Sequence, residues 1–317
     1  MSGNGGAAHF GASPTMRGRG MAQASLDLIE AAARWLKKAW PTTVRGVCYY
    51  LFGIEVIASM EKKNTDRVSD LLTRARERGL IPWEWLVDGV REREQVPSWD
   101  SPAAYVAAVR RSWRLNFWAQ QPQRVEVWSE KSTRRGILKP VLDEYGVAFL
   151  LGGGTSGATP VHDVAADEDK RPLVILYLGD FDPSGMAMTE KETRGNLRNR
   201  LVQYGGDHVR VERIALTMAD ARRMPQKFSF PAADKGPRPG SKGDANYPWF
   251  VAHYGDRCWE LDAMDPRALR RRLRARIEAN ILDRVEWERC ARVQRAEAES
   301  LQTALDAWPR ARREHNR

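Results

Sequence analysis

The chain has 317 residues but few cysteines and no long apolar run. Its three cysteines, Cys48, Cys258 and Cys290, show no C-x-x-C spacing, which argues against a zinc site or a disulfide framework and favours a reducing compartment. No segment approaches the ~20 apolar residues that a membrane span requires. Residues 1–20 are rich in glycine and lack the apolar stretch of a signal peptide, so we expect a disordered tail on a cytoplasmic protein.

Two common kinds of site chemistry are also missing. There is no G-x-x-x-x-G-K-[ST] motif, so the chain carries no recognisable ATPase of its own. The histidines are scattered and fit no nucleophile–base arrangement: His9, His162, His208, His253 and His315. GGGTSG at residues 152–157 fits the letters of a dinucleotide fingerprint, but the next apolar run ends in two acids rather than one ribose-binding acid. We favour a flexible loop there.

Positive charge is what the chain has in excess. The net charge of +10 predicts attraction to polyanions such as DNA. Residues 267–317 contribute strongly, with 14 Arg or Lys against 8 Asp or Glu. This basic tail has two interpretations: it grips a DNA backbone, or it is a helix that packs on its apolar side and exposes its arginines. The apolar side comprises Leu269, Leu273, Ile277 and Ile281.

The N-terminal part is predicted to be helical. Apolar spacing predicts helices over residues 25–40, 44–57 and from Asn64 to a Gly79 cap, followed by a strand or wing at 80–89. Three helices and a wing indicate a winged-helix DNA-binding domain over residues 21–119. Its third helix carries arginines that either meet phosphates or form a solvated polar face: Arg67, Arg74, Arg76 and Arg78. A further helix over 102–118 leads into a polar linker at 120–123.

From residue 124 onward, short β runs alternate with helices. The runs VEVWS, VAFLLG, LVILYLG and VRVERIAL predict an α/β domain with a mostly parallel, Rossmann-like sheet over residues 124–262. After about residue 217 the pattern becomes irregular. Basic helices are expected over residues 263–317.

Acidic residues stand where two of these β runs end. Glu130 follows the first run, and Asp180 and Asp182 follow LVILYLG. The carboxyl ends of parallel strands are where ligands bind in an open sheet. Three carboxylates there make an oxygen-only site suited to Mg²⁺. The alternative is that residues 180–184 form a turn whose Asp and Pro serve geometry alone.

A tyrosine pair is the second chemical feature. Arg45 precedes Tyr49 by four residues, so on a helix the two share a face. A neighbouring cation favours the phenolate of a group whose free pKa is about 10. Tyr50 is rotated by about 100° around the helix and is expected to face the core beside Ile54. The alternative is that both tyrosines only pack in the core.

Together these motifs resemble a known family. Glu130 with the Asp-x-Asp motif is similar to a Toprim domain, and the whole resembles the A subunit of type IIB topoisomerases (topoisomerase VI) and the meiotic double-strand-break transesterases. The matches are Arg45 and Tyr49, Glu130-Lys131, and the run Asp180 to Gly185. The small free-standing A-like proteins of phages and mobile elements look most similar.

The chain departs from the family pattern at two positions. Gly46 stands where an acid usually follows the arginine, which is expected to weaken activation of the tyrosine. Phe181 stands where the family usually has Gly between the two aspartates, and it is expected to narrow the loop near the metal.

The resemblance implies a mechanism. Tyr49 attacks a DNA phosphate to form a 5′-phosphotyrosine link, and Asp180 and Asp182 hold Mg²⁺. Glu130 acts as general acid/base or completes the metal shell, while Lys131 and Arg45 neutralise developing charge.

It also implies the setting in which this chemistry takes place. The expected partners are double-stranded DNA, a second copy of the chain in a C2 homodimer, and a separate ATPase B-like subunit, in association with the nucleoid. Two alternatives stand beside it: a Toprim nuclease that hydrolyses DNA with water, and a non-catalytic DNA-binding protein with a relict Toprim fold.

Overall fold

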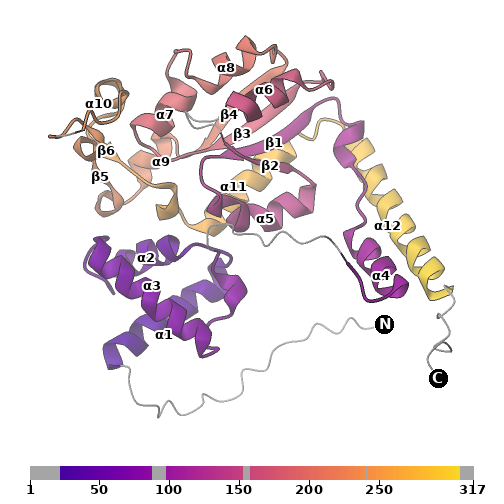
Figure 1. Cartoon of the computed structure of the whole chain (residues 1–317), viewed down its shortest axis with the longest axis horizontal. Helices are drawn as coiled ribbons and strands as arrows, with labels where there is room; N and C mark the ends of the chain where they lie inside the picture. The colour runs from indigo at the N-terminus through magenta and orange to yellow at the C-terminus, as the bar shows by residue number, and fades with distance from the viewer. Residues whose placement is uncertain (1–21, 88–97, 153–157, 240, 308–317) are drawn as a thin grey trace.

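The computed structural model describes residues 22–87, 98–152, 158–239 and 241–307. The expected disordered tail at 1–20 and residues 153–157 of GGGTSG lie outside the described residues. Helices α1 (Gln23–Ala39), α2 (Val44–Gly53) and α3 (Lys62–Glu77) form the N-terminal part (Figure 1). Their apolar faces meet in a separate core that includes Leu28, Leu36, Val47, Leu51, Val68 and Leu72.

The ends of these helices follow local chemistry. The Thr43 hydroxyl caps α2 by accepting from the Gly46 amide, and Gly79 adopts a positive φ of 70° just beyond α3. Helix α2 is shorter than expected, because Gly53 ends it and Glu55 takes a positive φ of 63°. Residues 54–57 are therefore not helical.

The expected strand at 80–89 is wrong for the residues that the structure describes. Trp83–Trp85 forms a 3₁₀ turn, and Leu86 makes a single parallel bridge to Thr42, while residues 88 and 89 lie outside the description. The Trp83 ring instead covers the guanidinium of Arg76, at 4.7 Å from its centroid. Arg76 is thus buried, whereas Arg67 and Arg74 on α3 and Arg78 at its C-cap are exposed.

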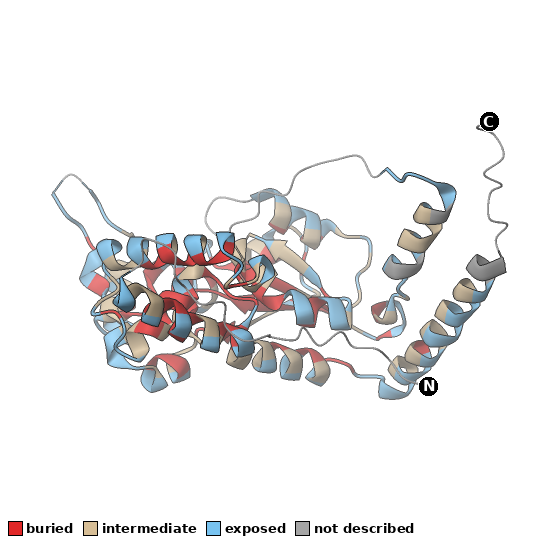
Figure 2. Cartoon of the chain, turned by 90° about the horizontal axis from the view of Figure 1, so that it is seen from below, coloured by how far each residue is buried: buried red, intermediate tan, exposed pale blue. Residues whose placement is uncertain are grey.

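Helix α4 (Pro102–Ser112) and the 3₁₀ turn Phe117–Gln120 lead toward the sheet. Helix α4 lies beside the long α12 (Arg284–Ala307), and both stand away from the buried body of the protein (Figure 2). The stretch expected to be a linker is held in place: the Gln121 side chain donates to the Asp283 carbonyl at 2.9 Å and accepts from its amide at 3.0 Å.

The parallel sheet expected from the sequence is confirmed. In the described residues, β1 (Arg124–Ser129), β2 (Ala148–Leu151), β3 (Leu173–Leu178) and β4 (Val209–Ala215) form a four-stranded, all-parallel sheet in the order β2-β1-β3-β4. Every residue of β3 is buried, because a central parallel strand is covered on both faces and therefore reads as a continuous apolar run.

Helices cover both faces of this sheet (Figure 1). One face packs against α6 (Ala158–Ala166) and α8 (Leu197–Gln203), whose buried residues include Val161 and Leu201. The other face packs against α5 (Thr133–Tyr145) and α11 (Pro266–Ala279). The connection after β1 and the one that reaches β4 thus run on opposite faces.

The stretch after residue 217 is more regular than expected. It contains α9 (Met218–Arg223), α10 (Tyr247–Tyr254) and a small antiparallel pair, β5 (Phe230–Pro231) with β6 (Arg257–Cys258). These elements are too short to give a periodic signal in the sequence. Three 3₁₀ turns connect them: Gln226–Phe228, Ala232–Lys235 and Leu261–Ala263.

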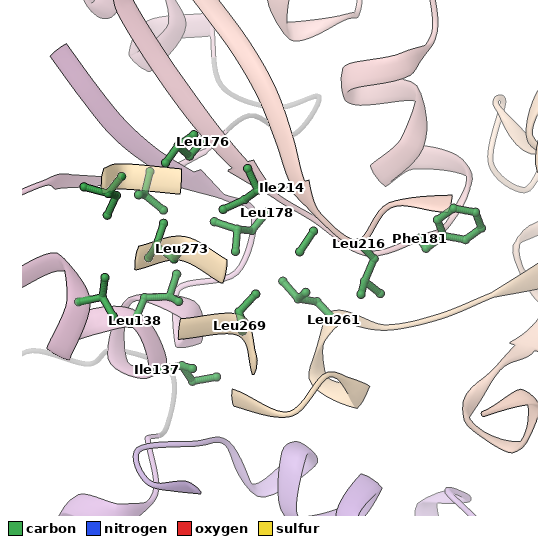
Figure 3. Packing of buried hydrophobic residues seen from close by; sticks show 14 of the residues in the cluster. Ile137, Leu138, Leu176, Leu178, Phe181, Ile214, Leu216, Leu261, Leu269 and Leu273 are labelled. Carbon is green, nitrogen blue, oxygen red and sulfur yellow. The ribbon is translucent and has the colours of Figure 1, made fainter. Parts of the chain in front are cut away.

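Helix α11 belongs to the core, so the apolar side of the basic tail packs as expected over this helix. Leu269, Leu273 and Ile277 are almost fully buried against the sheet and α5 (Figure 3). Its arginines also have partners within the protein. Arg272 pairs with Asp220 at 2.6 Å, and Arg270 donates to carbonyls at the end of α1 and beyond it.

None of the helices in the described part of the chain combines the length and apolarity needed to cross a bilayer.

Leu273→Ala is expected to lower the free energy of unfolding by about 2–5 kcal/mol, because it opens a cavity between α11 and the sheet. Leu282→Ala is the matched control: Leu282 is 58% exposed, and its loss should change stability by less than ~0.5 kcal/mol. Urea unfolding followed by circular dichroism measures both. Equal effects of the two substitutions would contradict the placement of α11 in the core.

Candidate active site

The predicted carboxylates lie at one edge of the sheet. Strands β1 and β3 are neighbours, and Ser129 is level with Leu178, so Glu130 and the Asp180 loop leave the sheet side by side. The order β2-β1-β3-β4 places this point where the chain changes from one side of β1 to the other. Such a switch point leaves a crevice at the carboxyl ends of the strands, which is where open α/β sheets bind ligands.

The loop after β3 is held rigidly by two residues. Gly185 approaches the loop so closely that an added Cβ would lie 2.4 Å from the Asp180 carbonyl oxygen. Arg213, on β4, donates to the carbonyls of Asp180 at 2.5 Å and Gly185 at 2.7 Å. Arg213 lies outside the motifs that the sequence indicates. Its role is to fix the backbone from which the aspartates project.

Asp182 has a structural role of its own. It is the N-cap of α7 (Pro183–Glu190): its Oδ1 accepts from the Gly185 amide at 2.8 Å, and Pro183 occupies the first helical position. The turn interpretation is therefore correct for one of its oxygens. The other oxygen, Oδ2, lies 3.2 Å from the ammonium of Lys235. Burial lowers the pKa of Lys235, but this carboxylate outweighs it and the pKa is raised overall.

Asp180 is held from two sides. Its Oδ2 accepts from Lys131 Nζ at 2.7 Å, and its Oδ1 accepts from the Leu261 amide at 2.9 Å. This pairing brings Lys131, which follows Glu130 in the chain, onto the second predicted acid. The Glu-Lys and Asp-x-Asp motifs are thus in direct contact.

Glu130 accepts from the Tyr177 hydroxyl at 3.0 Å. The pKa of Glu130 is raised: burial has the largest effect, the Tyr177 hydrogen bond opposes it, and the charges of Asp182 and Asp180 add to the rise. The three predicted carboxylates therefore influence one another. This repulsion is the electrostatic condition that a bound cation relieves.

The chemistry of these oxygens fits Mg²⁺, whereas their present partners are ammonium groups. In the residues that the structure describes, no three Asp, Glu, His or Cys side chains gather as a set of metal ligands. Lys131 and Lys235 neutralise the two aspartates instead, and their side chains are about 40% exposed (41% and 42%). Glu130, Asp180 and Asp182 are the residues that would hold a divalent cation in place of these ammonium groups.

Phe181 does not narrow the loop as expected. Its side chain is fully buried and packs against Phe250, Tyr254 and Trp259, at centroid distances of 5.5 to 5.9 Å. The backbone of Phe181 exchanges hydrogen bonds with that of Trp259 at 2.9 and 3.0 Å. The aromatic between the two aspartates therefore anchors the loop to the segment 257–262.

That segment also contacts the predicted nucleophile. Glu260 Oε2 pairs with the guanidinium of Arg45 and accepts from the Tyr49 hydroxyl at 3.3 Å. Arg45 and Tyr49 share a face of α2 as predicted, with the guanidinium 5.7 Å from the ring centroid. Tyr49 is nevertheless only 4% exposed, and a cavity of about 170 Å³ lies beside it.

The expected stabilisation of the phenolate is wrong for this geometry. The pKa of Tyr49 is raised well above its ordinary value, because burial and the negative charge of Glu260 outweigh the positive charge of Arg45. Tyr50 packs against the N-terminal core as expected, but it stacks on Trp35 of α1, at 4.7 Å between ring centroids, and not on Ile54, which is 47% exposed.

A second acid on the segment joins the two parts of the protein. The Asp262 carboxylate accepts two hydrogen bonds from Arg134, at 2.8 and 2.9 Å, and one from the Thr43 hydroxyl at 2.7 Å. Sequence reasoning missed both Glu260 and Asp262. The signal was weak: acids alternate with the apolar residues Trp259 and Leu261 along four positions.

Gly46 packs closely at this junction. A Cβ there would lie 2.6 Å from the Thr42 hydroxyl oxygen, so an acid directly after Arg45 would require the buried Thr42 to shift.

Comparison of the chain with protein-family models and with curated proteins finds no match.

Asp262→Asn should lower the free energy of unfolding by about 3–5 kcal/mol at pH 7, because it removes the nearest counter-charge of the buried Arg134 and leaves only Asp180, at 3.9 Å. Burial raises the pKa of Asp262, but Arg134 outweighs it, so the folded-state pKa is depressed. The stabilisation is therefore full above the unfolded-state pKa of about 3.9 and is lost as pH falls through the folded-state value. Denaturant titrations should show that the difference in free energy of unfolding between wild type and variant shrinks below about pH 4.

Asp143→Asn is the control, since Asp143 forms an exposed pair with Lys139. It should change stability by less than ~1 kcal/mol. If the difference in free energy of unfolding between wild type and Asp262→Asn did not depend on pH, the stabilising role given to the Arg134–Asp262 pair would be wrong.

Proposed function

We propose that this protein is a Mg²⁺-dependent DNA-cleaving transesterase that resembles the A subunit of type IIB topoisomerases. The observation that carries the proposal is the shared attachment of both motifs to the segment Trp259–Asp262. Glu260 contacts Arg45 and Tyr49, while the Leu261 amide binds Asp180. Side chains distant in sequence thus meet at the carboxyl edge of the parallel sheet. In this proposal the sheet region is a Toprim domain and α1–α3 belong to a winged-helix domain.

The chemistry follows from the residues. The Tyr49 oxygen attacks a DNA phosphorus, the 3′ oxygen leaves, and protein stays linked to the 5′ end. Lys131 and Lys235, displaced from the aspartates, are placed to neutralise phosphate charge, and Arg45 lies beside the attacking oxygen. Mg²⁺, held by Glu130, Asp180 and Asp182, would supply charge stabilisation at the phosphate.

DNA and a second copy of the chain are the proposed partners. The exposed Arg67, Arg74 and Arg78 of α3 offer phosphate contacts in a chain of net charge +10. Among the described contacts, Tyr49 bonds to Glu260 and touches none of the three carboxylates. A C2 dimer, in which Tyr49 works with the partner's carboxylates, agrees with these contacts. A separate ATPase subunit would drive strand passage.

A second candidate is a nuclease that hydrolyses DNA with water at the same carboxylates. The burial of Tyr49 and its raised pKa favour it, because a buried phenol is a poor nucleophile. Protein covalently linked to 5′ ends supports the transesterase. Mg²⁺-dependent cutting that persists in Tyr49→Phe supports the nuclease. A chain that binds DNA without cutting is the remaining, non-catalytic alternative.

Glu130→Gln, Asp180→Asn and Asp182→Asn should each slow Mg²⁺-dependent plasmid cleavage by about 100-fold or more, because each removes charge from the metal and phosphate site. Asp182→Asn should preserve α7, since asparagine caps helices as well as aspartate does. Asp143→Asn is the control, because its 2.7 Å pair with Lys139 has the same length as that of Asp180 with Lys131 but lies on the surface. Wild-type rates in all three variants would exclude the proposal.

Mixed dimers test the partnership between copies. Tyr49→Phe and Asp180→Asn should each be inactive alone. Mixed, they should regain nicking of one strand, because a heterodimer then holds one complete site built from Tyr49 of one copy and Asp180 of the other. Plasmid nicking on agarose gels measures this. If mixing restores nothing while wild type cuts, each chain uses its own carboxylates.

A further inference from the structure

Glu260 is a carboxylate in direct contact with the proposed nucleophile. Its Oε2 accepts from the Tyr49 hydroxyl at 3.3 Å and pairs with Arg45 Nε. The Glu260 side chain is 20% exposed. Neither Glu260 nor this contact follows from the sequence motifs.

The surroundings fix this carboxylate in place. The preceding residue, Trp259, is hydrogen-bonded to Phe181, and the following one, Leu261, donates its amide to Asp180. Asp262, the other acid of the segment, is already occupied by Arg134 and Thr43. Among the described residues, the carboxylate that lies within hydrogen-bond distance of the Tyr49 oxygen is therefore that of Glu260.

We propose that Glu260 is the general base that accepts the Tyr49 proton during attack on DNA, with Arg45 positioning its carboxylate. This inference rests on the proposed function. As the Tyr49 oxygen bonds to phosphorus, its proton passes to Glu260 Oε2. The bond from phosphorus to the 3′ oxygen breaks, its electron pair stays on that oxygen, and the oxygen takes a proton from water. Resealing runs the same transfers in reverse.

The energetics favour a transfer concerted with attack. The phenol is buried beside a negative charge, so a free phenolate is costly there. As the new bond to phosphorus forms, the phenolic oxygen loses basicity, and a carboxylate then becomes an adequate acceptor. General bases placed in this way typically contribute 10²- to 10⁴-fold in rate.

Glu260 has a competing structural interpretation, because its pair with Arg45 also ties α2 to the segment 259–262. A purely structural contact and a general base respond differently to substitution. Glu260→Gln keeps the size of the side chain and an oxygen that accepts from Arg45 and Tyr49, but it cannot accept a proton.

The experiment measures covalent adduct formation on supercoiled plasmid with Mg²⁺ against pH. Glu260→Gln should lower the adduct rate by about 100-fold or more near pH 7, with DNA binding unchanged. Its remaining rate should rise about tenfold per pH unit, since it then depends on free phenolate. The wild-type profile should be much flatter. Among the described residues, the charged groups near the pair include Arg45 and Asp262, and Asp265 lines the same cavity as Tyr49. Lys227 binds the Gly53 carbonyl at the end of α2.

Two further measurements distinguish a general-base role of Glu260 from a purely structural one. Spectroscopic titration of tyrosine, with Tyr49→Phe to assign the signal, should show that Glu260→Gln lowers the pKa of Tyr49 by removing the neighbouring charge. Added formate should restore adduct formation in Glu260→Ala but not in Tyr49→Phe. The matched control is Glu278→Gln, which alters another Tyr–Glu pair, Tyr145 with Glu278, and should leave adducts at the wild-type level.

The outcomes distinguish this inference from the function on which it rests. A wild-type chain that cuts but never carries protein on 5′ ends overturns the transesterase, and the base with it. A wild type that forms adducts, with a Glu260→Gln variant of equal rate and pH profile, overturns the base alone. Loss of stability in Glu260→Gln with an unchanged pH profile also overturns the general-base role, and identifies Glu260 as a structural contact between α2 and the segment 259–262.

Discussion

The buried ion pair between Arg134 and Asp262 is the contact on which the arrangement of the site depends. Arg134 belongs to the first turn of α5, four residues after Glu130, and Asp262 also holds Thr43 at the start of α2. One carboxylate therefore fixes the helix of the proposed nucleophile relative to the strand that carries Glu130. A buried pair of this kind contributes little net stability compared with apolar packing. Its value here is geometric, because a bidentate pair permits one relative orientation.

Lysines balance the negative charge at the edge of the sheet. Acidic groups at the sheet edge belong to a chain that is strongly basic, and lysines reach two of them from different elements: Lys131 from the end of β1 and Lys235 from the turn after β5. Long side chains of this type can leave without unfolding anything. The backbone beneath them cannot, because Arg213 and Gly185 hold the Asp180 loop closely. The site thus combines carboxylates on a closely held backbone with two half-exposed lysines as their partners.

The tyrosine pair illustrates how packing overrides a simple helical argument. Rotation by one residue separates Tyr49 from Tyr50, as the helix period requires. The period does not say what covers each side. Helix α2 lies between α1 on one side and the segment around Phe228 and Glu260 on the other, so both tyrosines find partners. Tyr49 is consequently the more buried of the two, and its local charges raise its pKa rather than lowering it.

The sequence by itself determined most of the regular elements and which acids follow the β strands. Apolar runs such as LVILYL and the positions of Glu130 and Asp180 after β strands are local patterns, and they predicted the N-terminal helices and the parallel sheet. The pairing of β1 with β3 brings these acids to the same edge. Short elements after residue 217 and the end of α2 at Gly53 were missed because local periodicity is too brief there. Glu260, Asp262 and Arg213 were invisible for a different reason. Their partners lie far away in the chain, and only the tertiary structure decides which carboxylate meets which cation.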